Sequence, residues 1–251
     1  MNPFPFINQT LHAEAVPIPY IVEQVGTPVY IYSASHILDT YRQFTEAFRE
    51  LPHLLCYAVK ANSNLAILHL LAQEGAGADI VSGGELYRAL QAGIPPAKIV
   101  YSGVGKTERE IVEALRAGVY RLHIESMQEF ECLQQISHAL KTHVHLAPRI
   151  NPDIDAHTHP YISTGVNATK FGMSAEEART VFERSRQAAY LDVTGVSGHI
   201  GSQIITMAPF VAMVKFLAAF IEERRAEGFR IDTLDIGGGL GIAYHQEQPP
   251  T

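Results

Sequence analysis

The sequence predicts an α/β fold of the TIM type, a (β/α)8 barrel that is incomplete at its C-terminal end. Short apolar segments alternate with amphipathic segments of roughly 10 to 20 residues, which is typical of βαβ units around a mostly parallel sheet. A length of 251 residues suits one such barrel. The cluster Gly237-Gly238-Gly239 follows the last apolar segment, where barrels commonly bind phosphate, whereas an open doubly wound sheet has its glycine turn after the first strand.

Seven expected strands belong to the barrel, one fewer than a closed barrel needs. They cover residues 54–60, 78–82, 98–102, 120–124, 142–150, 193–200 and 231–236. Helices are expected between them at residues 64–74, 84–92, 107–117, 126–140, 174–189 and 209–227. Upstream, a strand at residues 28–32 precedes a helix at residues 35–50 with a serine N-cap. Residues 31–251 are therefore expected to form the barrel domain, truncated before an eighth strand, and residues 1–30 a lead-in strand and loop outside it.

The bulk properties are those of a metabolic enzyme of the cytoplasm. No apolar run approaches the ~20 residues of a membrane span, and the N-terminus lacks the basic start and long apolar stretch of a signal peptide. The two cysteines, Cys56 and Cys132, make no disulfide framework or metal motif. A net charge of −7 disfavours non-specific nucleic-acid binding. We therefore expect a cytoplasmic protein with a small-molecule substrate and with neither nucleic-acid nor membrane partners.

Lys60 ends an apolar run that begins at Leu54, and the polar turn Asn62-Ser63-Asn64 follows it. At the end of a buried strand, desolvation favours the neutral amine, and the neutral amine is the form that condenses with aldehydes. The alternative is an ordinary lysine whose ammonium group reaches out of the strand end into water. Residue type and position alone leave both interpretations open.

Further candidates stand at the ends of other expected strands. The amides of Gly237, Gly238 and Gly239 can surround an anion, or the three glycines can form a flexible turn. His199 can serve as an acid or base, a metal ligand or a flat stacking surface, and its plain alternative is a core histidine with satisfied hydrogen bonds. No second ligand lies beside His199 at metal spacing, so no metal site is expected.

Three charged residues lie on or beside the same set of strands. Asp79 stands in an apolar strand, where a carboxylate must find a partner or shift its pKa. Arg149 lies at another strand end, either as part of a site or as half of a structural ion pair. Glu85 is expected at the start of the following helix, where its charge suits the helix dipole.

Residues 57–62, with the sequence YAVKAN, resemble the pyridoxal-phosphate lysine segment of the ornithine/diaminopimelate/arginine decarboxylase family. Residues 199–203, HIGSQ, resemble the His-x-Gly-Ser motif of the same family. The resemblance implies that Lys60 is the lysine that carries pyridoxal 5′-phosphate. It also implies that His199 packs on the cofactor ring and that the Ser202 hydroxyl bonds the cofactor phosphate.

The same resemblance extends to the remaining candidates. It implies that Gly237, Gly238 and Gly239 form the loop for the cofactor phosphate. Asp79 is implied to lie near the cofactor lysine, and Arg149 to organise hydrogen bonds of the site.

A long loop at residues 151–172 carries features that resemble the diaminopimelate branch of the family, namely residues 158–165, THPYISTG, and residues 170–172, KFG. This resemblance implies loss of carbon dioxide from meso-2,6-diaminopimelate to give L-lysine, by a homodimeric enzyme. The pair His157 and His159, like His143 and His145, could mimic metal ligands, but no third ligand accompanies either pair.

The chain also departs from the family pattern. Family members continue into an eighth strand with a Glu-Pro-Gly-Arg motif and a β-domain with a Cys-Glu pair, and neither is found up to Thr251. We therefore expect a fragment or a short form with doubtful activity of its own. Two alternatives stay open: a decarboxylase of another basic amino acid or an alanine-racemase-like enzyme, and a non-catalytic barrel that binds pyridoxal phosphate.

Overall fold

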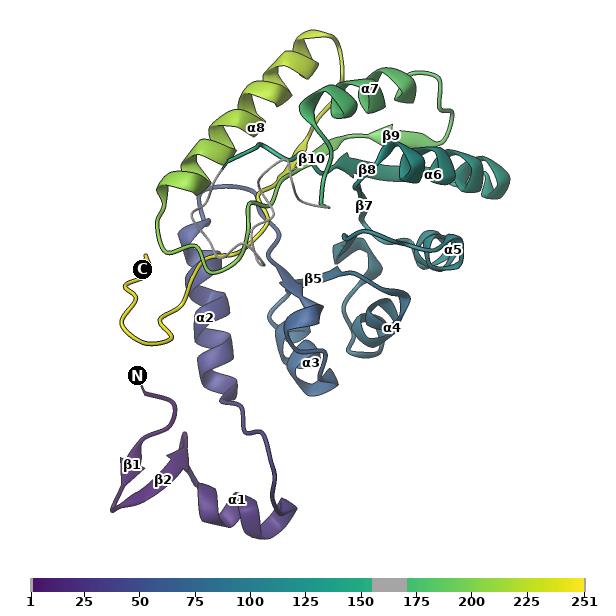
Figure 1. Ribbon diagram of the computed structural model, residues 1–251. Coiled ribbons are helices and arrows are strands. Elements are labelled where there is room, and N and C mark those ends of the chain that lie inside the picture. The colour runs from purple at the N-terminus through teal and green to yellow at the C-terminus, as the bar shows by residue number, and fades with distance from the viewer. Residues whose placement is uncertain (1, 155–170, 251) are drawn as a thin grey trace.

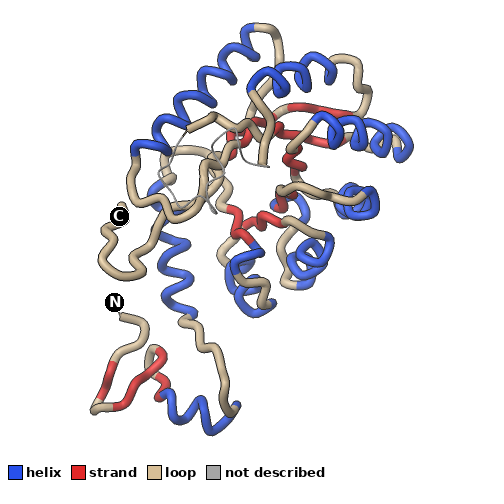
Figure 2. Tube along the Cα trace, viewed as in Figure 1, coloured by secondary structure: helices blue, strands red, loops and turns tan. Residues whose placement is uncertain are grey.

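The computed structural model describes residues 2–154 and 171–250, and it shows a curved parallel sheet with helices on its outer side (Figures 1 and 2). Six strands pair side by side in chain order: β4 (Cys56–Ala58), β5 (Gly77–Ile80), β6 (Ile99–Tyr101), β7 (Arg121–Ile124), β8 (Val144–Pro148) and β9 (Leu191–Val193). Every one of these pairings is parallel. The arrangement confirms the predicted α/β barrel architecture.

The strand predicted at residues 193–200 is two strands. Val193, at the end of β9, lies opposite Leu146 of β8, and the chain then leaves that ladder. Strand β10 (Gly195–Ser197) pairs in parallel with β11 (Thr233–Asp235) instead. The N–H of Ile150 donates to the carbonyl of Ser197 at 2.8 Å, so the end of β8 still holds β10 in the arc. In the described residues β4 and β11 are the two edges of the arc, as expected of a barrel without its eighth strand.

The helices lie where the sequence predicts them. They are α2 (Ala34–Ala47), α3 (Leu65–Gln73), α4 (Gly83–Gln91), α5 (Glu108–Ala117), α6 (Met127–Leu140), α7 (Ala175–Ser185) and α8 (Ala208–Ala226). Side chains of Ser82, Thr107, Ser126 and Ser174 cap α4 to α7 by accepting a backbone N–H in the first turn. The serine predicted to cap α2 is Ser33, whose hydroxyl accepts the N–H of His36. No helix in the described part of the chain is long and apolar enough to cross a membrane.

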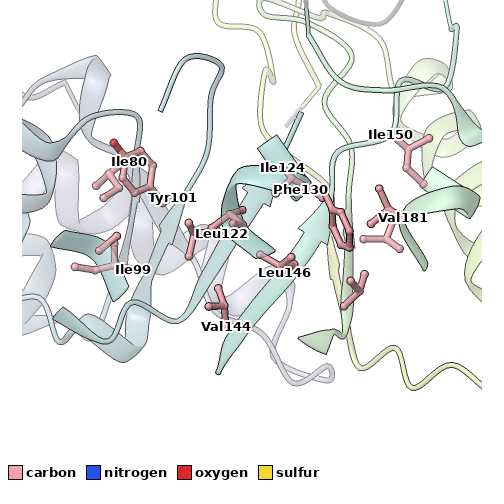
Figure 3. Packing of buried hydrophobic residues seen from close by; sticks show 14 of the residues in the cluster. Ile80, Ile99, Tyr101, Leu122, Ile124, Phe130, Val144, Leu146, Ile150 and Val181 are labelled. Atoms are coloured by element: carbon pink, nitrogen blue, oxygen red, sulfur yellow. The ribbon is translucent and has the colours of Figure 1, made fainter. Parts of the chain in front are cut away.

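The hydrophobic core lies between the sheet and the helices (Figure 3). Alternate strand residues point outward into it, including Ile80, Tyr101, Leu122 and Leu146, which are almost fully buried. They pack in one cluster with helix residues such as Phe130 of α6. Because side chains alternate between the two faces of a strand, the intervening residues point into the barrel interior.

The barrel interior contains a buried arginine, Arg121. Arg121 of β7 is 3% exposed, and its guanidinium donates to the Thr233 hydroxyl at 3.0 Å and lies 3.4 Å from the Asp232 carboxylate. A Cβ at Gly195 would lie 2.1 Å from the Arg121 guanidinium, so β10 has a glycine where the arginine crosses. Arg121 thus connects β7 to β11, which lie far apart in the sequence.

The N-terminal residues form a small separate unit below the barrel (Figures 1 and 2). Three short antiparallel strands, β1 (Phe6–Ile7), β2 (Thr10–Ala13) and β3 (Val16–Pro17), precede α1 (Ile18–Val25). The hydroxyl of Ser33 and the N–H of Ser35 both donate to Oε1 of Glu14, which connects this unit to the start of α2.

The strand predicted at residues 28–32 is wrong. These residues have no regular secondary structure and pair with no described strand, and Tyr30 is 87% exposed. An apolar run forms a strand only where a neighbouring strand accepts its hydrogen bonds, and sequence pattern does not report that neighbour.

Candidate functional site

The predicted site residues lie at the carboxyl ends of the strands, which parallel strands place at one mouth of the barrel. Lys60 follows β4, Asp79 lies on β5, Arg149 follows β8 and His199 follows β10. The charges of Lys60 and Arg149 act on the pKa of both Asp79 and His199. The structure therefore brings these four side chains together in one electrostatic environment.

Lys60 differs from expectation in its exposure. The strand ends at Ala58, and Val59–Ala61 forms a single 3-10 turn. Val59 is fully buried in this turn, whereas Lys60 is exposed at the mouth. The expectation of an amine desolvated within the strand is thus wrong, because the turn gives the buried position to Val59. The exposed amine is within reach of a small molecule that enters the mouth.

Asp79 is the unusual carboxylate of the site. Its Oδ1 is buried and has no hydrogen-bond partner among the described residues. Burial raises the pKa of Asp79 to about 6; the Ser102 hydrogen bond opposes this shift, Asp235 adds to it, and Lys60 and Arg149 oppose it. A carboxylate oxygen without a donor, beside a lysine, is a group that a bound cation or N–H would satisfy.

The raised pKa makes folding stability depend on pH. The folded state binds the Asp79 proton more tightly than the unfolded state does, so the stabilisation is present below the ordinary value of 3.8 and is lost as pH rises through about 6. We expect Asp79→Asn to increase the free energy of unfolding by roughly 1–3 kcal/mol at about pH 7.5, with the gain shrinking toward pH 4. Urea titrations at both pH values measure it.

An exposed aspartate provides the matched control. The Asp39 side chain on α2 is 62% exposed, so Asp39→Asn is expected to change stability little at either pH. If Asp79→Asn lowers stability at pH 7.5, then the Asp79 carboxylate is ionised and satisfied there, and the buried oxygen has a partner after all.

Arg149 forms a structural ion pair, which is one of the two roles that its position in the sequence allows. Its guanidinium donates to Oε1 of Glu125 at 3.0 Å, and both side chains are nearly buried, at 12% and 4% exposed. The other oxygen of Glu125 accepts the N–H of Gly172 at 2.7 Å. The Phe171 ring lies 5.1 Å from the guanidinium carbon. Arg149 is therefore held in a fixed orientation, with its charge still acting on Asp79 and His199.

His199 is held as a neutral imidazole. Burial, together with the charges of Arg149 and Lys60, lowers the pKa of His199 to about 4 against the opposing effect of Asp235. Its Nδ1 accepts the N–H of Gly238 at 3.3 Å, so the proton of the neutral ring is on Nε2. The result is a flat, uncharged ring beside the glycine loop.

The glycine loop has the backbone that its sequence implies. Gly237 and Gly239 have φ of +66° and +98°, in the left-handed region. A Cβ at Gly239 would lie 1.9 Å from the carbonyl oxygen of Gly201, whereas a Cβ at Gly238 would meet nothing within 4 Å. The loop after β11 therefore packs closely on the loop after β10.

An anion nest needs backbone N–H groups that are free to bind the anion, but two N–H groups of this loop already form hydrogen bonds within the protein. The N–H of Gly237 donates to Oδ1 of Asp235 at 2.7 Å, and that of Gly238 donates to His199. Gly237, Gly238 and Ser202 are nevertheless exposed at the mouth, where an anion can approach them.

Glu85 lies where the sequence predicts it, and the histidine pairs do not form a described metal site. Glu85 lies in the first turn of α4, where its carboxylate accepts the N–H of Val81 at 2.7 Å. His143 pairs with Asp192 at 3.1 Å rather than with His145. Among the residues that the structure describes, no group of three or more His, Cys, Asp or Glu is arranged as metal ligands. His157, His159 and the rest of residues 158–165 lie outside the described residues.

Sequence reasoning missed Ser102, His123 and Glu125. Each lies two residues from an inward-facing position on its strand, and this period of two is the signal that could have found them. Ser102 Oγ is 3.1 Å from Nδ1 of His123, and Nε2 of His123 is 3.7 Å from Oδ2 of Asp235. A buried polar chain thus lies beneath the mouth.

Comparison with known proteins finds the same kind of domain. Residues 34–251 match the family model described as pyridoxal-dependent decarboxylase, pyridoxal binding domain. The diaminopimelate decarboxylase of Pseudomonas aeruginosa is 46% identical over 250 residues, which cover 100% of this chain and 60% of that protein.

Two solved structures agree. The diaminopimelate decarboxylase of Helicobacter pylori complexed with L-lysine gives a TM-score of 0.91 at 40% identity, over 93% of this chain and 59% of that one. The M. jannaschii diaminopimelate decarboxylase, also in complex with L-lysine, gives 0.93 at 35% identity, over 100% of this chain and 60% of that one. The chain thus spans about 60% of the length of the curated relatives that it matches.

Proposed function

The chain belongs to the pyridoxal-dependent decarboxylase family, and on that premise we propose that it is the cofactor-binding part of a diaminopimelate decarboxylase. The reaction is loss of carbon dioxide from meso-2,6-diaminopimelate to give L-lysine. The observation that carries the proposal is the meeting of Lys60, Asp79, Arg149 and His199 at one mouth, in a chain similar throughout to proteins with this activity.

The residues at the mouth fit pyridoxal 5′-phosphate, the cofactor of the family's matched domain. Lys60 supplies an exposed amine for an aldehyde, and Asp79 supplies a buried carboxylate oxygen that lacks a donor. His199 supplies a flat neutral ring on which a planar group can pack. Ser202 supplies an exposed hydroxyl for phosphate, and the glycine loop presents an exposed backbone beside it, with the Gly237 and Gly238 amides donating to Asp235 and His199. When bound, the cofactor supplies a pyridine ring that accepts the electron pair left by a departing carboxylate.

In this proposal each side chain has a distinct task. Lys60 holds the cofactor and gives it up to the substrate amine, while Asp79 beside it accepts or returns a proton. Arg149, fixed by Glu125, keeps the mouth positive and opposes protonation of His199. His199, through its Nδ1 contact with Gly238, keeps its ring at the glycine loop.

We extend the proposal to the organisation of the whole protein. Residues 31–251 act as the cofactor-binding barrel domain, and residues 1–30 as a lead-in that packs against the rest of the relatives' length. Phe6, Tyr20 and Val25 of the lead-in are more than half exposed, which suits a surface covered in the full protein. A cytoplasmic homodimer is proposed for that longer form.

Reduction with borohydride tests the role of Lys60. After the chain is loaded with pyridoxal phosphate and reduced, we expect peptide mapping to find the adduct on the peptide that contains Lys60. Lys106 is an internal control, because its amine is 1% exposed and bonded to two carbonyls and to Glu129. Lys60→Arg should abolish the adduct while the protein stays folded. A dominant adduct on any other lysine would refute the assignment.

A further inference from the structure

A chain of four polar side chains crosses the barrel interior below the mouth. It runs from Asp79 of β5 through Ser102, which follows β6, to His123 of β7 and then to Asp235 of β11. Hydrogen bonding by the Ser102 side chain lowers the pKa of Asp79, and Ser102 Oγ lies 3.1 Å from Nδ1 of His123. Nε2 of His123 lies 3.7 Å from Oδ2 of Asp235, and His123 is 4% exposed. His123 is therefore buried in the middle of this series, Oδ1 of Asp79 is buried at one end, and the Asp235 side chain at the other end is 35% exposed.

Strand register places Ser102 beside His123, one inward-facing position further along the strands than Asp79. Asp79 lies opposite Val100 on β6, and Val100 lies opposite Arg121 on β7. Two residues further along each strand, on the same inward face, come Ser102 and His123. The contacts are therefore built into the sheet and do not depend on a loop.

The serine hydroxyl has a single proton, and this restricts the chain to two arrangements. When Asp79 is ionised, Ser102 donates to it, so Nδ1 of His123 must carry the proton that points at Ser102. When Asp79 is protonated, it donates to Ser102, and Ser102 donates to a bare Nδ1. The neutral ring then has its proton on Nε2, facing Asp235.

The charges around the chain favour a neutral His123 that can take a proton briefly. Burial lowers the pKa of His123, and Lys106 and Arg121 lower it further, whereas Asp235 and Glu125 raise it. Asp79 in turn faces Lys60, Arg149 and Asp235. The Asp235 carboxylate opposite Nε2 is the group that would stabilise an imidazolium.

We propose that Asp79, Ser102 and His123 form a proton relay that lets Asp79 gain and lose a proton through the buried imidazole of His123. In the transfer step the Asp79 carboxyl proton moves to Ser102 Oγ while the proton of that hydroxyl moves to Nδ1 of His123. Asp79 becomes a carboxylate, and His123 becomes an imidazolium whose Nε2–H faces Asp235. Ser102 and His123 are positioning residues for Asp79; the benefit to Lys60, whose amine must change protonation when it binds and releases an aldehyde, rests on the proposed function.

Nitrogen-15 NMR of the histidine side chains in the cofactor-free chain tests the relay. As Asp79 titrates near pH 6, we expect the ring proton of His123 to move from Nε2 to Nδ1, so that the two nitrogen resonances exchange their character. Ser102→Ala should remove this inflection from His123, and Ser102→Thr, which keeps the hydroxyl, should retain it. Asp79→Asn should also remove it. His143, exposed and paired with Asp192 on the outer surface, serves as the internal control.

Two results would overturn the relay. One is a His123 tautomer that stays constant while Asp79 titrates in the wild-type chain. The other is an inflection that persists in folded Ser102→Ala, because Asp79 would then act on His123 through space alone. Failure of the proposed function can be told apart from failure of the relay. If only the proposed function fails, borohydride leaves Lys60 unlabelled, but the His123 tautomer still changes with pH in the cofactor-free chain.

Discussion

The 251-residue chain alone is expected to produce lysine from meso-2,6-diaminopimelate at least about a hundredfold more slowly than a version extended to the full length of its relatives. The chain spans about 60% of those relatives, and β4 and β11 are the edges of the arc among the residues that the structure describes. A group that stabilises charge in the transition state typically contributes a hundredfold or more, so one such group in the remaining length of the relatives would account for the difference.

Product analysis with labelled substrate measures this difference. Parallel reactions with ornithine, lysine and alanine examine the other basic-amino-acid decarboxylase and the racemase-like alternatives in the same series. Cofactor binding to the 251-residue chain without turnover is the expected phenotype. Equal lysine production by the two versions would mean that the catalytic groups lie within these 251 residues.

Gly239→Ala is expected to lower the free energy of unfolding by about 2–5 kcal/mol. The φ of +98° costs an L-residue roughly 1–2 kcal/mol, and the added Cβ would lie 1.9 Å from a backbone oxygen, which neither loop can avoid without moving. Because this contact joins the loops after β10 and β11, we expect cofactor affinity to fall with it. Thermal unfolding and cofactor titration measure the two effects.

Gly238→Ala is the matched control from the same loop. Its Cβ would meet no protein atom within 4 Å, so folding stability should stay within about 0.5 kcal/mol of wild type. If the loop binds phosphate at its exposed face, Gly238→Ala should still weaken cofactor binding, because the added methyl group occupies that exposed face. Unchanged cofactor affinity in Gly238→Ala would move the phosphate away from this loop.

The barrel could be predicted because its elements have a strong local pattern. Apolar strands such as residues 120–124 and capped helices such as residues 126–140 repeat at a constant spacing, and the structure places β7 and α6 there. The break between β9 and β10 could not be predicted, because residues 193–200 carry no proline or charged residue that would mark the end of a strand. The two strands differ only in their partners, since β9 pairs with β8 and β10 pairs with β11.

The site was predicted where a residue type carries its own chemistry. Lys60, Asp79, Arg149 and His199 became candidates because a charge or imidazole at a strand end is costly without a use, and the family resemblance implied their roles. Ser102 and His123 were missed because the period of two shows only that they face inward, which many residues with no role in the site also do. Their importance comes from register, which brings Ser102 beside His123 and cannot be read from either strand alone.

The guanidinium of Arg121 links the start of β11 to β7, at the end of the strands opposite the mouth. Strand β11 is thus fixed in position by residues of this chain and needs no further strand beside it. An eighth strand would then pair with two edges, β4 and β11, that are already held in place. We therefore expect a separately made polypeptide that covers the remainder of the relatives' length to bind this chain and to restore turnover.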